Sequence, residues 1–193
     1  MHRYFAVYKP FGMLSQFSPE GERQTLAALG DFEKDVYPVG RLDGDSEGLL
    51  ILTNDKAMNS ALLNPNQLHV RTYYAQVEGE ITHDALEKLE SGIELKIKGK
   101  SHFTAPAQAV KMIDPTLPLR NPPIRFRKNV PTSWLELRII EGKNRQVRRM
   151  TVAVGFPTLR LVRWAIEDLT LASFEAGEVK EYQKNEIVKL LKL

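Results

Sequence analysis

The sequence predicts a mixed α+β fold, and three kinds of segment point to it. Short apolar runs, such as residues 4–8 and 49–52, are typical of buried strands. Capped stretches with helical periodicity, such as residues 82–91, are typical of short helices. A turn at residues 98–100 joins two extended runs, which indicates an antiparallel pair of strands. A chain of 193 residues supports one sizeable core, so we expect a single domain over residues 1–193, in which two lobes could share that core.

Composition narrows the class of protein. The chain holds no run of eighteen apolar residues and no charged-then-apolar leader, so we expect a soluble, cytoplasmic protein without a membrane segment. It contains no cysteine, which excludes disulfides and thiolate metal sites. The net charge is only +3, so any polyanionic partner must be argued from where the basic residues cluster.

In the first half, a short helix is expected at residues 25–29 and a buried strand at residues 49–52. Thr53 or Asn54 is expected to cap a helix that continues to about Leu63, because Pro65 prevents its continuation. Residues 68–78 fit a strand that carries Tyr73 and Tyr74 on opposite faces, with Tyr74 expected in the core.

Helices and strands are also expected to alternate in the second half of the chain. A helix capped by Thr82 runs to Ser91 and ends at Gly92, and strands are expected at residues 93–97, 103–112 and 134–140. Residues 114–131 contain five prolines, which cannot donate the hydrogen bonds of a sheet, so this basic, Pro-rich insertion is a surface excursion. A last strand at residues 161–166 and a helix from Asn185 close the chain.

Residues 144–154 predict a helix capped by Asn144 and ended by Gly155. Val147, Met150, Thr151 and Val154 share its core face. Arg145 and Arg149 then point away, and Arg148 lies on the flank, where a cation leans into a cleft.

Basic residues gather in two places: Arg120, Arg125, Arg127 and Lys128 in the insertion, and Lys143, Arg145, Arg148 and Arg149 at the start of the helix just described. Such clusters bind phosphates and provide affinity and register without reading sequence. The alternative for either cluster is an ordinary solvated surface.

The most informative segment is residues 40–55, GRLDGDSEGLLILTND. It sets Arg41 and Asp43 in a turn bounded by Gly40, Gly44 and Gly48, where glycine permits conformations that other residues avoid. The apolar run that follows anchors this turn. A fold presents a catalytic acid in this way.

Four segments together resemble the pseudouridine synthases, in the branch that modifies ribosomal RNA: residues 8–13 (YKPFGM, the first family motif), 40–55 (the central motif), 71–73 (RTY) and 141–150 (EGKNRQVRRM, the third family motif). They occur in the family's order and span nearly the whole chain. The resemblance implies the α+β fold of that family, with a central, largely antiparallel sheet crossed by the active-site cleft. Ser46 stands where relatives carry threonine, and Arg71 where many carry lysine; both changes keep the hydroxyl or the charge.

The resemblance implies that Asp43 is the essential carboxylate, with Asp45 as the competing candidate. It also implies that Tyr73 offers a face on which an extruded uracil stacks. A buried carboxylate stays ionised when a cation lies nearby, and Arg148 falls on the basic position of the third motif. Arg41 is expected to hold the place that the flipped base vacates.

Further RNA contacts are expected from the two basic clusters and from Lys9 and Arg71, although Lys9 and Pro10 also suit a role in shaping the loop beside the pocket. The chemistry needs no cofactor, and the four histidines have no metal-ligand spacing.

The first motif begins at residue 8, so we expect no small RNA-binding module ahead of it. This expected absence and the insertion resemble the E-type subgroup that acts on 23S ribosomal RNA. The resemblance implies a single uridine in domain V, near the peptidyl-transferase centre, in 23S RNA or a large-subunit assembly intermediate, and a monomeric enzyme. Two alternatives stay open: an inactive RNA-binding or assembly factor, and the same chemistry on 16S or another RNA.

Overall fold

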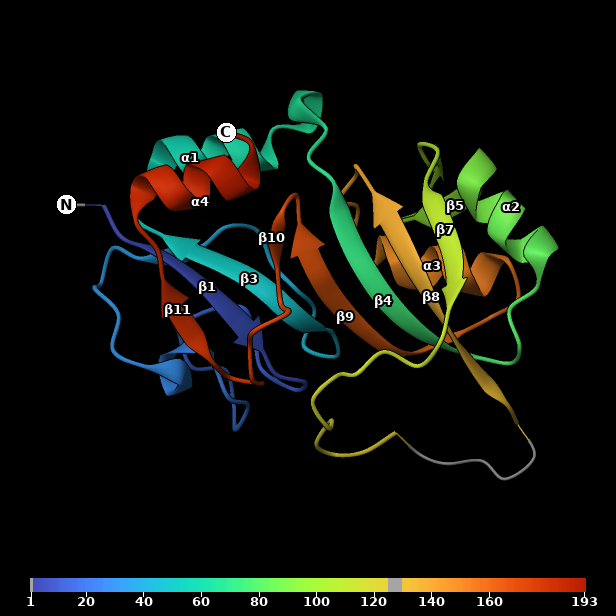
Figure 1. Ribbon diagram of the computed structural model, residues 1–193, viewed down its shortest axis with the longest axis horizontal. Coiled ribbons are helices and arrows are strands. Elements are labelled where there is room, and N and C mark those ends of the chain that lie inside the picture. Colours follow the sequence, from blue (N-terminus) through green and yellow to red (C-terminus); the bar gives the residue numbers. More distant parts are fainter. Residues whose placement is uncertain (1, 125–129) are drawn as a thin grey trace. The chain divides into compact units, whose positions relative to one another are not determined.

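The computed structural model describes residues 2–124 and 130–193, which form two compact units. Unit 1 contains the residues up to His69 together with Val162–Leu193, and unit 2 contains Val70–Leu161 (Figure 1). Both units combine strands with short helices, so the predicted α+β class is confirmed. None of the helices in these residues is long and apolar enough to span a membrane.

Unit 1 is built from the two ends of the chain. Its helices are α1 (Lys56–Leu63) and α4 (Lys184–Leu191), with 3-10 turns at Leu26–Leu29 and Pro65–Gln67. Its strands are β1 (Tyr4–Lys9), β2 (Tyr37–Pro38), β3 (Glu47–Thr53), β10 (Leu169–Thr170), β11 (Val179–Glu181) and most of β9 (Thr158–Ile166). The strand order is β11-β1-β3-β9, with β2 paired to β3 and β10 to β9.

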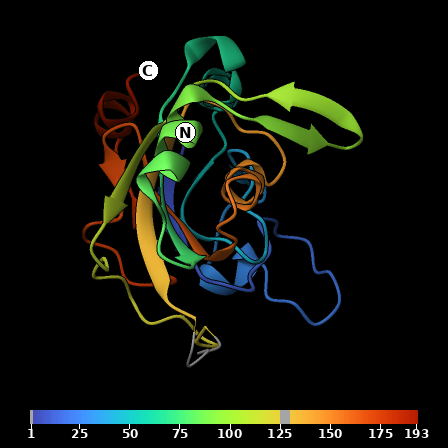
Figure 2. The same cartoon turned by 90° about the vertical axis from the view of Figure 1, so that its right-hand side faces the viewer.

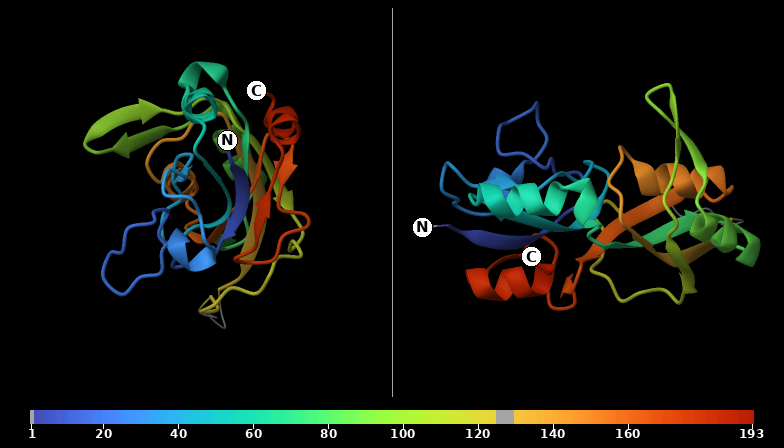
Figure 3. Two further views of the ribbon diagram at one scale, coloured as in Figure 1. Left: turned by 90° about the vertical axis from the view of Figure 1, so that its left-hand side faces the viewer. Right: turned by 90° about the horizontal axis from the view of Figure 1, so that it is seen from above.

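The centre of unit 1 is β3, whose seven residues are all buried. It pairs antiparallel with β1 and parallel with β9, so both of its edges are satisfied. A strand buried on both faces reads as a continuous apolar run, which is why residues 49–52 stand out in the sequence. Figure 3 shows α1 and α4 on opposite sides of β1.

Unit 2 holds the middle of the chain. Its helices are α2 (His83–Ser91) and α3 (Gln146–Ala153). Its strands are β4 (Arg71–Glu78), β5 (Glu94–Ile97), β6 (Lys100–Phe103), β7 (Gln108–Met112) and β8 (Thr132–Ile139). Strand β8 pairs antiparallel with β4 on one side and β7 on the other, whereas β5 and β6 form a separate two-stranded sheet.

One hydrophobic cluster joins these elements. It includes Ala75 of β4, Leu89 of α2, Leu135 of β8 and Met150 of α3, all with no exposed surface. The β5–β6 hairpin extends away from the other strands of unit 2 (Figure 2). Lys98 and Gly99 both take positive φ at its tip, as a two-residue hairpin turn of type I′ requires.

Several predicted boundaries were wrong. The expected strand at 103–112 is two strands, β6 and β7, because the intervening Thr104 turns back to exchange hydrogen bonds with Ile93. Asp55, rather than Thr53 or Asn54, caps α1 through its carboxylate. Arg145, in a left-handed conformation, occupies the cap position of α3 that was assigned to Asn144.

Other sequence predictions are confirmed. Thr82 caps α2 by accepting from the Ala85 amide, and Gly92 follows the helix. Val147, Met150 and Thr151 form the buried face of α3. The described part of the insertion contains neither helix nor strand before β8.

Gly48 is the position where the fold most needs glycine. Its φ is +110°, and a Cβ there would lie 2.4 Å from the backbone oxygen of Arg163 on the paired strand β9. Gly99 provides a matched comparison, because its φ is +79° but nothing lies within 4 Å of a Cβ.

We therefore expect Gly99→Ala to cost about 1–2 kcal/mol of unfolding free energy, from the left-handed conformation alone. Gly48→Ala should cost at least about 2 kcal/mol more, because β3 and β9 must also separate. Urea unfolding of both variants measures the difference. If both variants lost the same unfolding free energy, the close contact between a Cβ at position 48 and Arg163 would have no effect on stability.

Candidate active site

Asp43 lies in a tight turn just before β3. Its carbonyl accepts a hydrogen bond from the Ser46 amide at 3.0 Å, and its side chain is half-exposed. Gly40 takes a φ of +69°, which favours glycine, whereas Gly44 has no positive φ. The prediction that all three glycines are needed for their backbone freedom was therefore wrong for Gly44.

The first motif and Ser15, two residues after it, hold this turn from both sides of Asp43. The Gly12 amide donates to the Gly44 carbonyl at 2.7 Å. The Ser15 hydroxyl accepts from the Leu42 amide at 3.0 Å and lies 2.8 Å from the Leu42 carbonyl oxygen. Residues that are far apart in the sequence thus fix the backbone on which the carboxylate stands.

Lys9 lies beneath this loop. It has no exposed surface, and its ammonium donates to the carbonyls of Pro10 at 2.9 Å and Met13 at 2.7 Å. A buried ammonium that is bound to backbone carbonyls shapes a loop rather than a surface for phosphates. Of the two roles considered for Lys9, the structure favours the loop-shaping role and argues against direct contact with RNA.

Other charged residues are buried beside Lys9. Glu47 and Arg163 are 3% and 5% exposed. Burial lowers the pKa of Lys9 to about 8, and Arg163 acts in the same direction, while the carboxylates of Glu47, Asp45 and Asp43 raise it. The Asp43 turn therefore stands over an interior of mixed charge, which fixes the electrostatic field at the carboxylate.

Arg163 contributes an unusual feature to this interior. Its Nε donates to the Leu49 carbonyl at 2.7 Å, but its buried Nη2 has no hydrogen-bond partner among the described residues. The buried hydroxyl of Ser46 lacks one as well. Leaving a buried donor without a partner costs about 1–3 kcal/mol, and such groups often mark functional sites.

Arg41 is exposed on the same loop, two residues before Asp43. An exposed guanidinium and a half-exposed carboxylate on one turn are both reachable by a macromolecular substrate. This placement is compatible with the predicted role of Arg41 beside an extruded base.

In unit 2, Tyr73 is 8% exposed and belongs to the hydrophobic cluster, whereas its neighbour Tyr74 is half-exposed. The two side chains alternate across β4 as predicted, but the expectation that Tyr74 is the core residue was wrong. Burial raises the pKa of Tyr74, and the carboxylate of Glu136 adds to this shift.

Arg148 is half-buried on α3, and its Nη1 donates to the Thr158 carbonyl at 3.3 Å. This half-burial agrees with the flank position predicted from helical geometry. The expectation that Arg149 points away was wrong, because Arg149 is half-buried too and its Nη1 donates to the Lys96 carbonyl. Tyr73 and Arg148 belong to unit 2 and Asp43 to unit 1, so their cooperation stays a prediction from the motifs.

Hydrogen bonds of the Glu141 and Gln146 side chains stabilise the third motif. The Glu141 carboxylate accepts from the Gln146 amide at 2.8 Å and the Ala105 backbone amide at 2.9 Å, and it lies 3.0 Å from His102 Nε2. Gln146 in turn accepts from the Lys143 amide at 3.0 Å. Glu141 thus links the β6 strand to the start of α3.

The remaining predicted RNA contacts fall on several surfaces. Lys143 and Arg145 are exposed, and Arg71, Arg120 and Arg149 are half-buried. Arg120 donates to the Pro122 carbonyl at 2.8 Å. Arg125, Arg127 and Lys128 lie outside the described residues. Across residues 2–124 and 130–193, no three His, Asp or Glu side chains group as a metal site.

Comparison with known proteins decides the family. The family model described as RNA pseudouridylate synthase matches residues 3–153, a span that contains all four motifs. The chain belongs to the RNA pseudouridylate synthase family. Its activity is accordingly that of an RNA isomerase that converts uridine to pseudouridine.

Individual relatives agree with this family. Ribosomal large subunit pseudouridine synthase E of Vibrio parahaemolyticus is 51% identical over 176 residues, covering 91% of this chain and 71% of the relative. The protein of the same name from Xanthomonas axonopodis is 52% identical, covering 84% and 85%. A crystal structure of a pseudouridylate synthase superimposes with a TM-score of 0.78 at 26% identity, covering 98% of this chain and 74% of that one.

The motifs of this synthase did not reveal every residue of its site. Arg163 follows the span that the family model matches, and in the sequence it is one arginine in a strand. Glu47 and Gln146 stand inside quoted motifs, but nothing in their spacing indicates burial. Arg163 is the one charged residue in the expected apolar strand at residues 161–166, and this is the signal that would have singled it out.

We expect Lys9→Met to change how stability depends on pH. The pKa of Lys9 is about 8 in the folded protein and near 10.5 when unfolded, so between these values the unfolded chain binds more protons. The wild-type free energy of unfolding, relative to Lys9→Met, should then rise by about 3 kcal/mol between pH 8 and 10.5. Denaturant unfolding at several pH values measures this; a flat or falling difference would contradict it.

Proposed function

We propose that this synthase isomerises one specific uridine of 23S ribosomal RNA, in domain V near the peptidyl-transferase centre, as a monomer in the cytoplasm. The supporting observation is its 51% and 52% identity to proteins named for the large ribosomal subunit, over more than 80% of the chain. Either 23S RNA or a large-subunit assembly intermediate is the substrate.

The reaction breaks the bond between ribose C1′ and uracil N1, rotates the base, and forms a bond from C1′ to C5. The hydrogen on C5 leaves and N1 becomes protonated, so substrate and product are isomers. In our proposal, Asp43 supplies the carboxylate that acts as nucleophile or stabilises a developing sugar cation. Asp43 must be ionised both to act as a nucleophile and to stabilise a cation.

We assign supporting roles by motif position. Arg148 keeps Asp43 ionised, because a nearby cation lowers the pKa of a carboxylate. Tyr73 provides the surface on which the flipped uracil lies, and its hydroxyl takes part in late proton transfer. Arg163 and Lys9 set the local field beneath the Asp43 turn, a role supported by their burial in unit 1.

The decisive test compares Asp43→Asn with Asp45→Asn. Both replacements remove one negative charge from the same half-exposed turn, so Asp45→Asn controls for charge and folding. On unmodified 23S transcript, we expect Asp43→Asn to lose at least about 10³-fold in rate, while Asp45→Asn stays within about tenfold of wild type. Carbodiimide mapping locates the product.

The same mapping distinguishes the alternatives. An inactive assembly factor would bind RNA without forming pseudouridine at any position. A synthase with another target would modify a 16S transcript and leave 23S unchanged. Turnover by Asp43→Asn would remove that carboxylate from its role.

Arg41→Ala tests the extrusion of the base. Flipping a paired nucleotide costs a few kcal/mol, and an arginine that fills the vacated place recovers part of this. We expect kcat/KM to fall roughly tenfold, or about 1.4 kcal/mol, on RNA whose target uridine is paired. On a variant RNA in which that uridine is already unpaired, the loss should disappear. An equal loss on both substrates would indicate a general binding role.

A further inference from the structure

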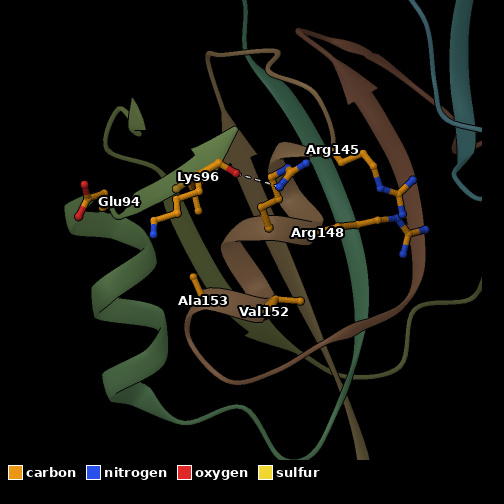
Figure 4. A pocket seen from close by; sticks show the side chains of 8 residues that line it. Glu94, Lys96, Arg145, Arg148, Val152 and Ala153 are labelled. Atoms are coloured by element: carbon orange, nitrogen blue, oxygen red, sulfur yellow. Dashed lines mark hydrogen bonds between the residues drawn. The ribbon is translucent and has the colours of Figure 1, made fainter. Parts of the chain in front are cut away.

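A groove opens in unit 2 between strand β5 and helix α3. Its volume is about 460 Å³, and it is lined by Glu94, Leu95, Lys96, Arg145, Arg148, Arg149, Val152 and Ala153. Figure 4 shows Lys96 on the β5 side and Arg145 and Arg148 on the helix side. The groove is therefore formed by the projecting hairpin on one side and by the third motif on the other.

Most of the charged side chains that line the groove are positive. The lining contains four basic side chains and a single carboxylate, that of Glu94, which accepts a hydrogen bond from the Ser101 hydroxyl across the hairpin. In Figure 4 the side chains of Arg145 and Arg148 run in the same direction, away from Lys96 on the β5 side. Like charges gathered in this way favour an anionic ligand.

The position of these cations on α3 supports the same conclusion. The first turn of the helix contains no acidic residue, and Arg145 occupies the cap position without capping it. The positive end of a helix dipole disfavours cations, so Arg145 and Arg148 at this end lower the stability of the helix. A bound anion would reverse this cost.

The two walls are held together before any ligand arrives. Arg149 Nη1 donates to the Lys96 carbonyl at 2.9 Å, and Arg149 Nε donates to the Asn144 carbonyl at 3.2 Å. At the base of the hairpin, His102 lies 3.0 Å from Glu141 of the third motif. A groove whose width is fixed in this way loses little conformational freedom on binding.

We propose that this groove binds the sugar–phosphate backbone of the substrate RNA, with Lys96 and Arg145 as phosphate contacts and Arg149 as the residue that fixes the walls. The β5–β6 hairpin is then an RNA-binding arm. A cationic groove with an apolar side suits a nucleic-acid backbone, and Val152, which is 57% exposed, provides that side. The inference rests on the proposed function only in taking RNA as the ligand.

The experiment measures binding of unmodified 23S transcript to the full chain over a series of salt concentrations. Lys96→Ala removes one exposed cation from the groove; Lys88→Ala, on the exposed side of α2, is the matched control. We expect Lys96→Ala to weaken binding roughly 3- to 10-fold. It should also reduce by about one the slope of the logarithm of the binding constant against the logarithm of the salt concentration. Lys88→Ala should leave both the affinity and this slope unchanged. Lys96→Arg should retain both.

Two results would overturn the proposal: wild-type affinity and slope in Lys96→Ala, or an equal loss in Lys88→Ala. The turnover of bound RNA separates this outcome from a failure of the proposed function. Lys88→Ala, which lies outside the groove, should form pseudouridine at the wild-type rate. If the wild type forms none, the proposed reaction fails, while the difference in binding still decides the groove.

Discussion

The burial of Lys9 is the constraint on which the site in unit 1 depends. An ammonium with no exposed surface must be satisfied by the protein, and Lys9 achieves this through the carbonyls of Pro10 and Met13. Those hydrogen bonds fix the first motif and the residues just after it in a conformation from which Gly12 and Ser15 reach the Asp43 turn. The charged interior therefore determines the backbone conformation as well as the electrostatic field, and both act on the same carboxylate.

In unit 2, hydrogen bonds of a charged side chain likewise hold helix α3 in place. Glu141 is linked to Gln146, to the Ala105 amide and to His102, so a single carboxylate positions the helix that carries three arginines. Cations at the positive end of a short helix are unfavourable on their own. Polar bracing and the hydrophobic face of Val147 and Met150 stabilise the helix against this effect. Its basic surface is therefore kept at some expense of stability, as expected of a surface that meets a polyanion.

The two units also differ in where their functional groups come from. In unit 1, the motif residues approach one another through contacts between the first motif, the Asp43 turn and β9, which are distant in the sequence. In unit 2, Arg145, Arg148 and Arg149 are neighbours in the chain, and the hairpin approaches them through Arg149 and the Lys96 carbonyl. The Asp43 turn is thus held by remote segments of the chain, whereas the cationic surface of α3 is largely local.

The sequence alone determined the fold class, the four motifs and their family, the buried strand after Asp43 and the core face of α3, because each depends on local periodicity or on residue types at fixed spacing. It placed Arg148 on the helix flank for the same reason. Only the tertiary structure decided that Lys9 is buried rather than surface-exposed, that Tyr73 rather than Tyr74 enters the core, and that Arg163 joins the site. Burial depends on which segments pack against a residue, and those segments lie far away in the chain.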